Sequence, residues 1–167
     1  MDALRTTVLV LAAMTTGLTA GVFAIYGNAV MPGLRSTDDR TFVGAFQSVD
    51  RAIINPWFIG GGFFGALGLA VAAAVLHLGE EWRSVLPWIV AAAVLHLVVV
   101  IITVAVNVPL NDAIKAAGDP ATIDVAAVRG AFDEARWVAW NWVRVALDLA
   151  AFGALAIALV VHGDAGS

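Results

Sequence analysis

The sequence contains no cysteine. A chain without cysteine has no disulfide, no thiolate metal ligand and no CxxC redox pair. Its absence excludes quinone-coupled thiol oxidation, a reaction of some small four-helix membrane proteins. The HExxH, GxGxxG, GxSxG and Walker patterns are also missing, so the sequence predicts no metalloprotease, dinucleotide, serine-hydrolase or nucleotide site of a familiar kind.

Charged residues are scarce, and basic residues do not outnumber acidic ones. Charged residues make up 13% of the chain, and the net charge is −4. No basic stripe is present, so no nucleic-acid partner is predicted. We predict no metal and no cofactor from the residues present.

Long apolar runs dominate what remains. Hydrophobic residues make up 61% of the chain, and the mean hydropathy is +0.91. Residues 6–34, 52–79 and 84–111 contain no Asp, Glu, Lys or Arg. Each run exceeds the roughly 20 residues that cross a bilayer. A fourth apolar segment, residues 137–162, is long enough but holds charges. The sequence therefore predicts an all-α, four-helix transmembrane bundle in one domain, 1–167, embedded in the lipid bilayer.

The helices are expected at about residues 5–30, 56–78, 85–106 and 137–162. We expect the first and third to end at Pro32 and Pro109, because proline interrupts helical hydrogen bonding. A signal peptide is the main competing interpretation of the first segment. Its basic end is weak, its apolar run is too long and no clean cleavage site follows, so we interpret it as a retained helix.

Two amphipathic segments, 38–54 and 110–134, fill the long connections and are predicted as interfacial helices at one end of the bundle. In the first, Phe42, Phe46, Val49 and Ile53 form one apolar stripe, with Gln47, Asp50 and two arginines off it. That pattern places the stripe against the bundle.

Glycine pairs at four-residue spacing mark two helices, notably Gly61 and Gly65. Such pairs let helix backbones approach closely in lipid. We predict that both glycines contact a neighbouring helix, and glycine-rich faces also leave room for an oligomer.

Most basic residues lie beside the long connections, with only Arg5 and Arg83 on the other side. The excess of Lys and Arg on cytoplasmic loops predicts long connections in the cytoplasm and both termini outside.

The fourth helix carries the most informative residues. Trp137, Asn141, Arg144 and Asp148 share one helical face. Charges inside a transmembrane segment are costly and mark functional sites by default. The alternative interpretation is a structural Arg144–Asp148 pair that pins two helices together, or an arginine that reaches the interface.

Polar and aromatic residues gather at the same predicted end of the bundle. An amide in hydrocarbon needs a partner, so several at one level indicate a shared network or a wet cavity. Each of these residues alone is explained by helix capping or by an interfacial tryptophan. The group comprises Asn28, Asn55, Trp57, Asn107, Asn111, Trp137, Trp140, Asn141 and Arg144.

The three histidines do not form an obvious ligand pair. Counted from the turn between helices two and three, His77 and His96 differ in depth by roughly 10 Å, which argues against haem or metal shared by the two. His96 is either a base or a core histidine bonded to a carbonyl, and we favour the second. His162, near the end of the chain, is uninformative.

Four motifs resemble the anthrone oxygenase-like family of small four-helix integral membrane proteins. They are AGVFAIYGNAVMPGL at 20–34, INPWF at 54–58, NVPLN at 107–111 and WxxWNxxR at 137–144. The resemblance spans nearly the whole chain, and its specific parts are the last two motifs. It implies oxidation of an anthrone-like or quinone-like aromatic by O₂ without a recognised cofactor.

In that interpretation Arg144, Asn107 and Asn141 would stabilise an oxyanion, and Trp57, Trp137 and Trp140 would enclose the ring. Asp148 and His96 are the candidate bases, and Asn28, Asn55 and Asn111 would complete the substrate site. The alternatives are a membrane binder of a small apolar ligand or partner helix, and a structural membrane protein.

Overall fold

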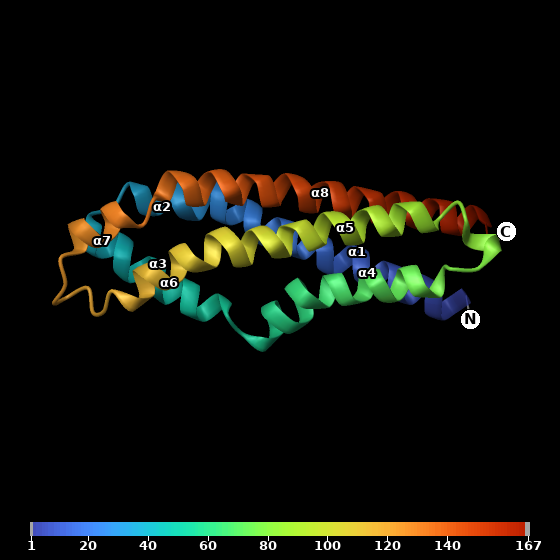
Figure 1. The fold of residues 1–167 in the computed structure, drawn as a ribbon, viewed down its shortest axis with the longest axis horizontal. Helices are drawn as coiled ribbons and strands as arrows, with labels where there is room; N and C mark the ends of the chain where they lie inside the picture. The colour runs from blue at the N-terminus through green and yellow to red at the C-terminus, as the bar shows by residue number, and fades with distance from the viewer. Residues whose placement is uncertain (1, 166–167) are drawn as a thin grey trace.

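A computed structural model describes residues 2–165. Four helices in that range are long and apolar enough to cross a membrane: Asp2–Arg35, Pro56–Leu76, Leu86–Ala116 and Glu134–Ala165. They form one elongated bundle with both chain ends at the same end (Figure 1). The predicted all-α transmembrane bundle is confirmed, and the chain is an integral membrane protein. The predicted domain limits, 1 and 167, lie outside the described residues.

The first and third spans each contain a short π-helical segment. The first consists of α1 (Asp2–Ile25), η1 (Tyr26–Val30) and α2 (Met31–Arg35). The third consists of α5 (Leu86–Ile102), η4 (Thr103–Asn107) and α6 (Val108–Ala116). The prediction that these helices end at their prolines was therefore wrong, because both run on past the proline.

The π segments explain how each proline is tolerated. In an α-helix the proline ring clashes with the carbonyl four residues earlier and the proline has no N–H to donate. For Pro32 that carbonyl belongs to Asn28, inside η1, where the Met31 N–H bonds to the Tyr26 oxygen five residues back. The third span repeats this arrangement before Pro109. The wider turn makes room for the ring and keeps the helix continuous.

The second and fourth spans differ at their starts. The second begins with a π-helical segment, η2 (Pro56–Phe63), and continues as α4 (Phe64–Leu76). Asn55 caps it by accepting a hydrogen bond from the Phe58 N–H at 3.0 Å. A short turn, η3 (Glu80–Trp82), leads to α5. The fourth span is one uninterrupted helix, α8 (Glu134–Ala165).

The two amphipathic segments lie together at the end of the bundle opposite the termini, as predicted (Figure 1). They contain α3 (Asp39–Ile53) and α7 (Val125–Ala131). The buried face of α3 is not the expected one: Phe42 and Phe46 are buried, but Val49 is 40% exposed. Gln47 and Asp50 are buried in its place. Partners on α6 and just beyond it explain this, because Gln47 donates to the carbonyls of Ile114 and Gly118.

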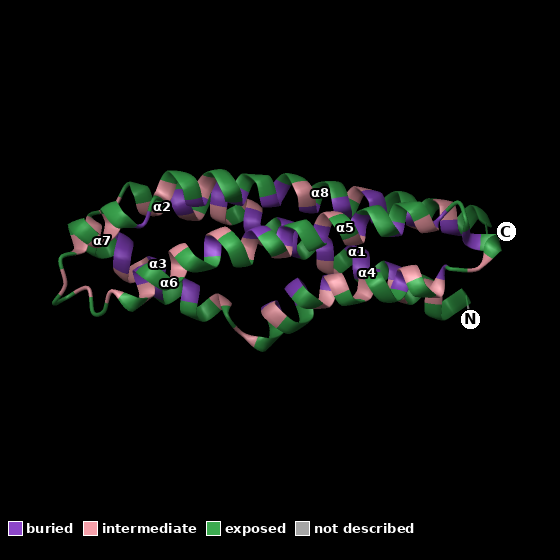
Figure 2. Cartoon of the chain, in the orientation of Figure 1, coloured by how far each residue is buried: buried purple, intermediate pink, exposed green. Residues whose placement is uncertain are grey.

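Buried residues face the inside of the bundle and exposed residues cover the outside (Figure 2), and the exposed residues include many large apolar side chains. The prediction for Gly61 and Gly65 was wrong. A Cβ at Gly61 would meet nothing within 4 Å, and one at Gly65 would meet only the Gly60 carbonyl of its own helix. The close approach between two helices lies instead at Gly27 of the first span, where a Cβ would lie 2.9 Å from Asn141 and Trp142 of α8. An oligomer through glycine-rich faces stays a prediction.

The end of the bundle that holds the termini has its own polar cluster. His77 Nε2 lies 3.1 Å from His162 Nδ1, and both rings are buried. Thr6 bonds to the other nitrogen of His162, and the Trp82 ring stacks on it. The interpretation of His162 as uninformative was wrong, because this histidine joins the first, second and last spans.

Candidate functional site

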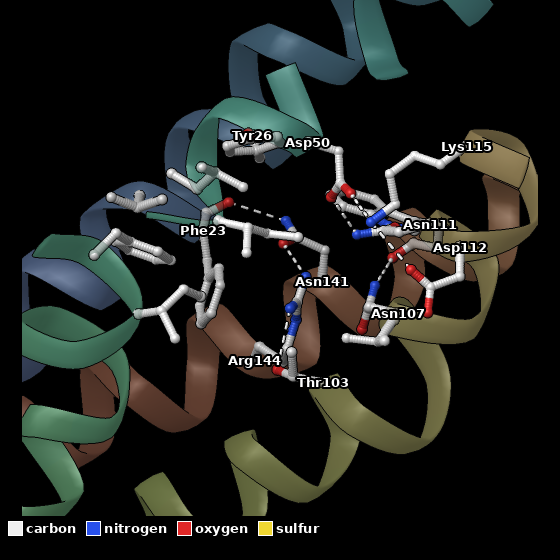
Figure 3. Close-up of a pocket in the computed structure, with 17 residues that line it drawn as sticks. Phe23, Tyr26, Asp50, Thr103, Asn107, Asn111, Asp112, Lys115, Asn141 and Arg144 are labelled. Carbon is white, nitrogen blue, oxygen red and sulfur yellow. Dashed lines mark hydrogen bonds and ion pairs between the residues drawn. The ribbon is translucent and has the colours of Figure 1, made fainter. Parts of the chain in front are cut away.

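A cavity of about 120 Å³ lies between the spans, near the end that carries α3, α6 and α7. Each span contributes at least one aromatic ring or polar side chain to its wall. The rings belong to Phe23, Tyr26, Phe58 and Trp137. The polar side chains belong to Asp50, Thr103, Asn107, Asn111, Asp112, Lys115, Asn141 and Arg144 (Figure 3).

Arg144 is the buried cation of this cavity, with 4% of its surface exposed. It donates to Thr103 Oγ1 at 3.1 Å and to Asn141 Oδ1 at 2.9 Å. Its guanidinium carbon lies 4.2 Å from the centre of the Phe23 ring and 5.6 Å from that of Trp137. The third nitrogen, Nε, is buried and has no hydrogen-bond partner. The side chain is thus held in place with one nitrogen left without a partner.

The two acceptors of Arg144 are fixed by bonds of their own. The Thr103 hydroxyl donates to the Val99 carbonyl at 2.8 Å, which leaves its lone pairs for the guanidinium. Asn141 donates its amide to the Phe23 carbonyl at 2.9 Å, so its oxygen faces Arg144. Asn141 reaches that carbonyl because Gly27 has no side chain. Helix packing at one glycine therefore sets the orientation of the arginine.

Arg144 meets one of the predicted asparagines, but the expected pair with Asp148 is absent among the described residues. Asp148 Oδ1 lies 2.7 Å from His96 Nδ1 instead, and both side chains are buried. An acid four residues after a base is the less favourable helical order. His96, on α5, takes the carboxylate, and its Nε2 lies 2.9 Å from the Phe63 carbonyl. His96 is bonded to a carbonyl as favoured, with a carboxylate as its second partner.

A second charged group lines the cavity, and the sequence did not single it out. Asp50, with 6% exposed, accepts from Asn111 Nδ2 at 2.6 Å. Lys115 Nζ lies 2.7 Å from the other oxygen, an ion pair without hydrogen-bond geometry. Trp137 Nε1 donates to Asn111 Oδ1 at 2.7 Å. The sequence held one signal of this burial: Asp50 continues the i, i+4 row of Phe42 and Phe46, so it lies on the same helical face as these buried rings.

Residues 55–154 match a family model described as anthrone oxygenase. The chain belongs to the anthrone oxygenase family. The predicted resemblance is confirmed, and the match includes Arg144, Asn141 and Asn107. Asp50 and Tyr26 precede the matched range. No curated protein and no solved structure matches this member of the family.

In this anthrone oxygenase family member, five of the predicted site residues line the cavity: Asn107, Asn111, Trp137, Asn141 and Arg144. The other six lie elsewhere. Asn28 is exposed, Asn55 is a helix cap and Trp57 is 67% exposed. Trp140 is 38% exposed, on the outside of α8. His96 and Asp148 form their own buried pair, off the cavity wall.

The donors and acceptors of the cavity suit a ligand with a polar oxygen and an apolar ring. Arg144 Nε is a free donor, and Asn107 Oδ1 and the Tyr26 hydroxyl are buried without hydrogen-bond partners. Aromatic rings make most of the remaining wall. Among residues 2–165, no three His, Asp or Glu side chains are grouped so as to hold a metal ion.

Proposed function

We propose that the protein is a membrane oxygenase that oxidises a lipid-soluble aromatic ketone or phenol of the anthrone or quinone type with O₂, without a cofactor. The observation that carries this proposal is Arg144: a buried, oriented guanidinium with one unpartnered nitrogen, in a residue that lines an aromatic cavity. Family membership supplies the reaction class.

The energetics favour a binding arginine. A charged side chain at the centre of a bilayer costs about 3 kcal/mol on insertion scales. Arginine has five N–H donors, and an arginine with a purely structural role is expected to satisfy them within the protein. Arg144 has neutral acceptors, Thr103 and Asn141, and within residues 2–165 no carboxylate forms an ion pair with it. Its charge is thus available to a ligand oxygen that becomes negative during reaction.

The cavity size favours partial burial of a flat ligand. Its volume of about 120 Å³ resembles the roughly 150 Å³ apolar cavity that accepts benzene in another protein. The part of a fused aromatic that carries the oxygen fits inside, and the rest extends towards the surface, where Ile54 on the rim is 56% exposed. Phe23 and Trp137 would flank the inserted ring. Trp57 and Trp140 have no place in this binding mode.

The proposed reaction balances without an added reductant. An anthrone has a methylene group across its central ring from a carbonyl. Loss of a methylene proton gives an electron-rich enolate, which transfers electrons to O₂. One oxygen atom becomes the second carbonyl of the product and the other leaves as water. The substrate is oxidised and O₂ is reduced, so the protein needs only to promote the deprotonation and stabilise the negative oxygen.

The test is oxidation of anthrone by purified protein in detergent, measured as O₂ uptake and anthraquinone formation. We expect Arg144→Met to lower kcat/KM by about 100-fold or more, the effect of losing one preorganised oxyanion donor. Arg144→Lys keeps the charge and should retain part of the activity. If both variants lose only thermal stability, the proposal fails.

A non-enzymatic binder of the same ligand class is the second candidate. It is favoured by the pairing of a free donor, Arg144 Nε, with a free acceptor, Asn107 Oδ1, in one cavity. Such a pair would bind a hydroxy-ketone without reaction. Saturable binding of anthraquinone, with no O₂ uptake from anthrone, would select this function. A purely structural role suits the His96–Asp148 pair better than Arg144.

We propose an orientation with the long connections in the cytoplasm, as the distribution of basic residues predicts. The cysteine-free sequence gives a direct test, because a single introduced cysteine is the only thiol. Ser36→Cys and Ser84→Cys lie at exposed positions at opposite ends of the bundle. In intact cells an impermeant maleimide should label only the second. Labelling of the first alone reverses the orientation.

A further inference from the structure

We propose that Asp50 is the general base of this site and that Lys115 and Asp112 carry the proton away. The inference rests on the proposed function and deepens it, because it assigns the deprotonation step to a carboxylate outside the family match. Asp50 lies near the end of α3 and lines the same cavity as Arg144.

Two neighbouring side chains hold Asp50 at the wall of the cavity. Its side chain is only 8% exposed, yet Lys115 lies 2.7 Å from one oxygen and Asn111 donates to the other at 2.6 Å. These contacts fix the position of the carboxylate. The Asp148 carboxylate, in contrast, is already held by His96 and does not line the cavity.

Asp50 and Arg144 both line the cavity but lie apart in Figure 3, Asp50 beside Lys115 and Arg144 beside Thr103. This separation matches the substrate class. The carbonyl oxygen and the methylene carbon of an anthrone lie across the central ring from each other. A substrate whose oxygen accepts a bond from Arg144 Nε therefore points its methylene towards the side of the cavity where Asp50 lies.

In the proposed step, Asp50 takes a methylene proton and the C–H bond breaks. The electron pair of that bond moves into the ring and onto the carbonyl oxygen, beside the guanidinium. The Lys115 ammonium donates one of its protons to Asp112, and the amine that is left takes the proton of Asp50. Lys115 Nζ lies 3.0 Å from Asp112, whose side chain is 62% exposed. The carboxylate of Asp50 is thereby restored, and O₂ oxidises the enolate.

The experiment isolates this step by omitting O₂. Anthrone is incubated with purified protein in deuterated buffer under anaerobic conditions, and deuterium entry into the methylene is followed by NMR. We expect the wild type to exceed the spontaneous exchange rate. Asp50→Asn should lower the enzymatic part by about 100-fold or more, the usual contribution of a general base. Asp50→Glu, which can still pair with Lys115, should retain exchange above the spontaneous rate.

Asp133→Asn is the matched control, since Asp133 is an exposed acid at the same end of the bundle and does not line the cavity. It should exchange like the wild type. A second measurement separates a lost base from a lost fold. At alkaline pH anthrone ionises in solution, so O₂ uptake by Asp50→Asn above the protein-free rate should recover towards that of the wild type, whereas a misfolded variant stays at the protein-free rate.

The outcomes distinguish the two proposals. If Asp50→Asn exchanges at the wild-type rate while Arg144→Met abolishes O₂ uptake, Asp50 is not the base and the proposed function stands. Failure of Asp50→Asn to recover at alkaline pH, with an unchanged melting temperature, also overturns the assignment. If the wild type neither exchanges nor oxidises anthrone, the proposed function fails.

Discussion

Asp148 gives its carboxylate to His96, 52 residues away in sequence, and not to Arg144 on the preceding turn of its own helix. Both nitrogens of His96 face oxygen acceptors, the Asp148 carboxylate and the Phe63 carbonyl. Each of these two contacts needs a hydrogen, whereas a neutral imidazole beside an ionised carboxylate has only one. The His96–Asp148 pair therefore holds one additional proton. The pair ties α5, α8 and η2 together in the middle of the bundle.

The first prediction tests this tie. His96→Leu removes one partner and leaves a buried carboxylate, so we expect a loss of about 3 kcal/mol or more in unfolding free energy. The double variant His96→Leu with Asp148→Leu removes both polar groups and should recover part of that loss. Denaturant unfolding in detergent measures both. Additive losses in the double variant would show that the two residues do not act as a pair.

The second prediction concerns the contact between α1 and α8. Gly27→Ala places a methyl group 2.9 Å from Asn141 and Trp142, which should cost about 1–3 kcal/mol through overpacking. Because Asn141 orients Arg144, the variant should also weaken anthraquinone binding. Gly21→Ala is the matched control, since nothing lies within 4 Å of its added methyl group. Equal melting temperatures for the two variants would contradict the close approach.

The third prediction separates two tryptophans that the sequence grouped together. Trp137→Phe removes the N–H that Asn111 accepts at 2.7 Å and opens a gap in the cavity wall. We expect weaker anthraquinone binding by about tenfold, since a lost buried hydrogen bond costs about 1–3 kcal/mol. Trp57→Phe, at a 67% exposed position, should bind as the wild type does. Titration of ligand fluorescence gives both constants, and the reverse order of effects would rule out this cavity.

The fourth prediction is a pH dependence at the start of α3. Asp38 accepts from the N–H and the hydroxyl of Thr41, and these hydrogen bonds lower the pKa of the Asp38 carboxyl. A carboxyl whose pKa is lowered by folding stabilises the protein above its unfolded pKa, about 3.9, and loses that effect as pH falls through the folded value.

The difference in melting temperature between wild type and Asp38→Ala should therefore be constant above about pH 5 and shrink below about pH 4. Asp38→Asn keeps an acceptor for the helix cap and serves as the control, because asparagine does not titrate. A wild-type difference that grows on acidification would contradict the capping role.

Much of the fold could be predicted because it is encoded in local composition. Runs without charge fix the number of spans, since a bilayer requires about 20 apolar residues whatever their partners are. The amphipathic pattern of residues 38–54 and 110–134 likewise placed both segments at one end. Asn107, Asn111, Trp137, Asn141 and Arg144 were identified because polar groups are rare in such runs and stand out.

The polar partners were decided only by the tertiary structure. The sequence offered Arg144 as the partner of Asp148, and only the packing of α5 on α8 brings His96 to it. The sequence placed Asp50 off the apolar stripe of residues 38–54, and only the fold brings Lys115 of α6 to it. Pro32 and Pro109 were predicted to be helix ends because helix propensity carries no information on π-helical turns. An apolar run forms a span whatever its neighbours are, because lipid surrounds every span alike. The partner of a buried charge, in contrast, depends on which single residue of a distant helix lies within about 3 Å of it.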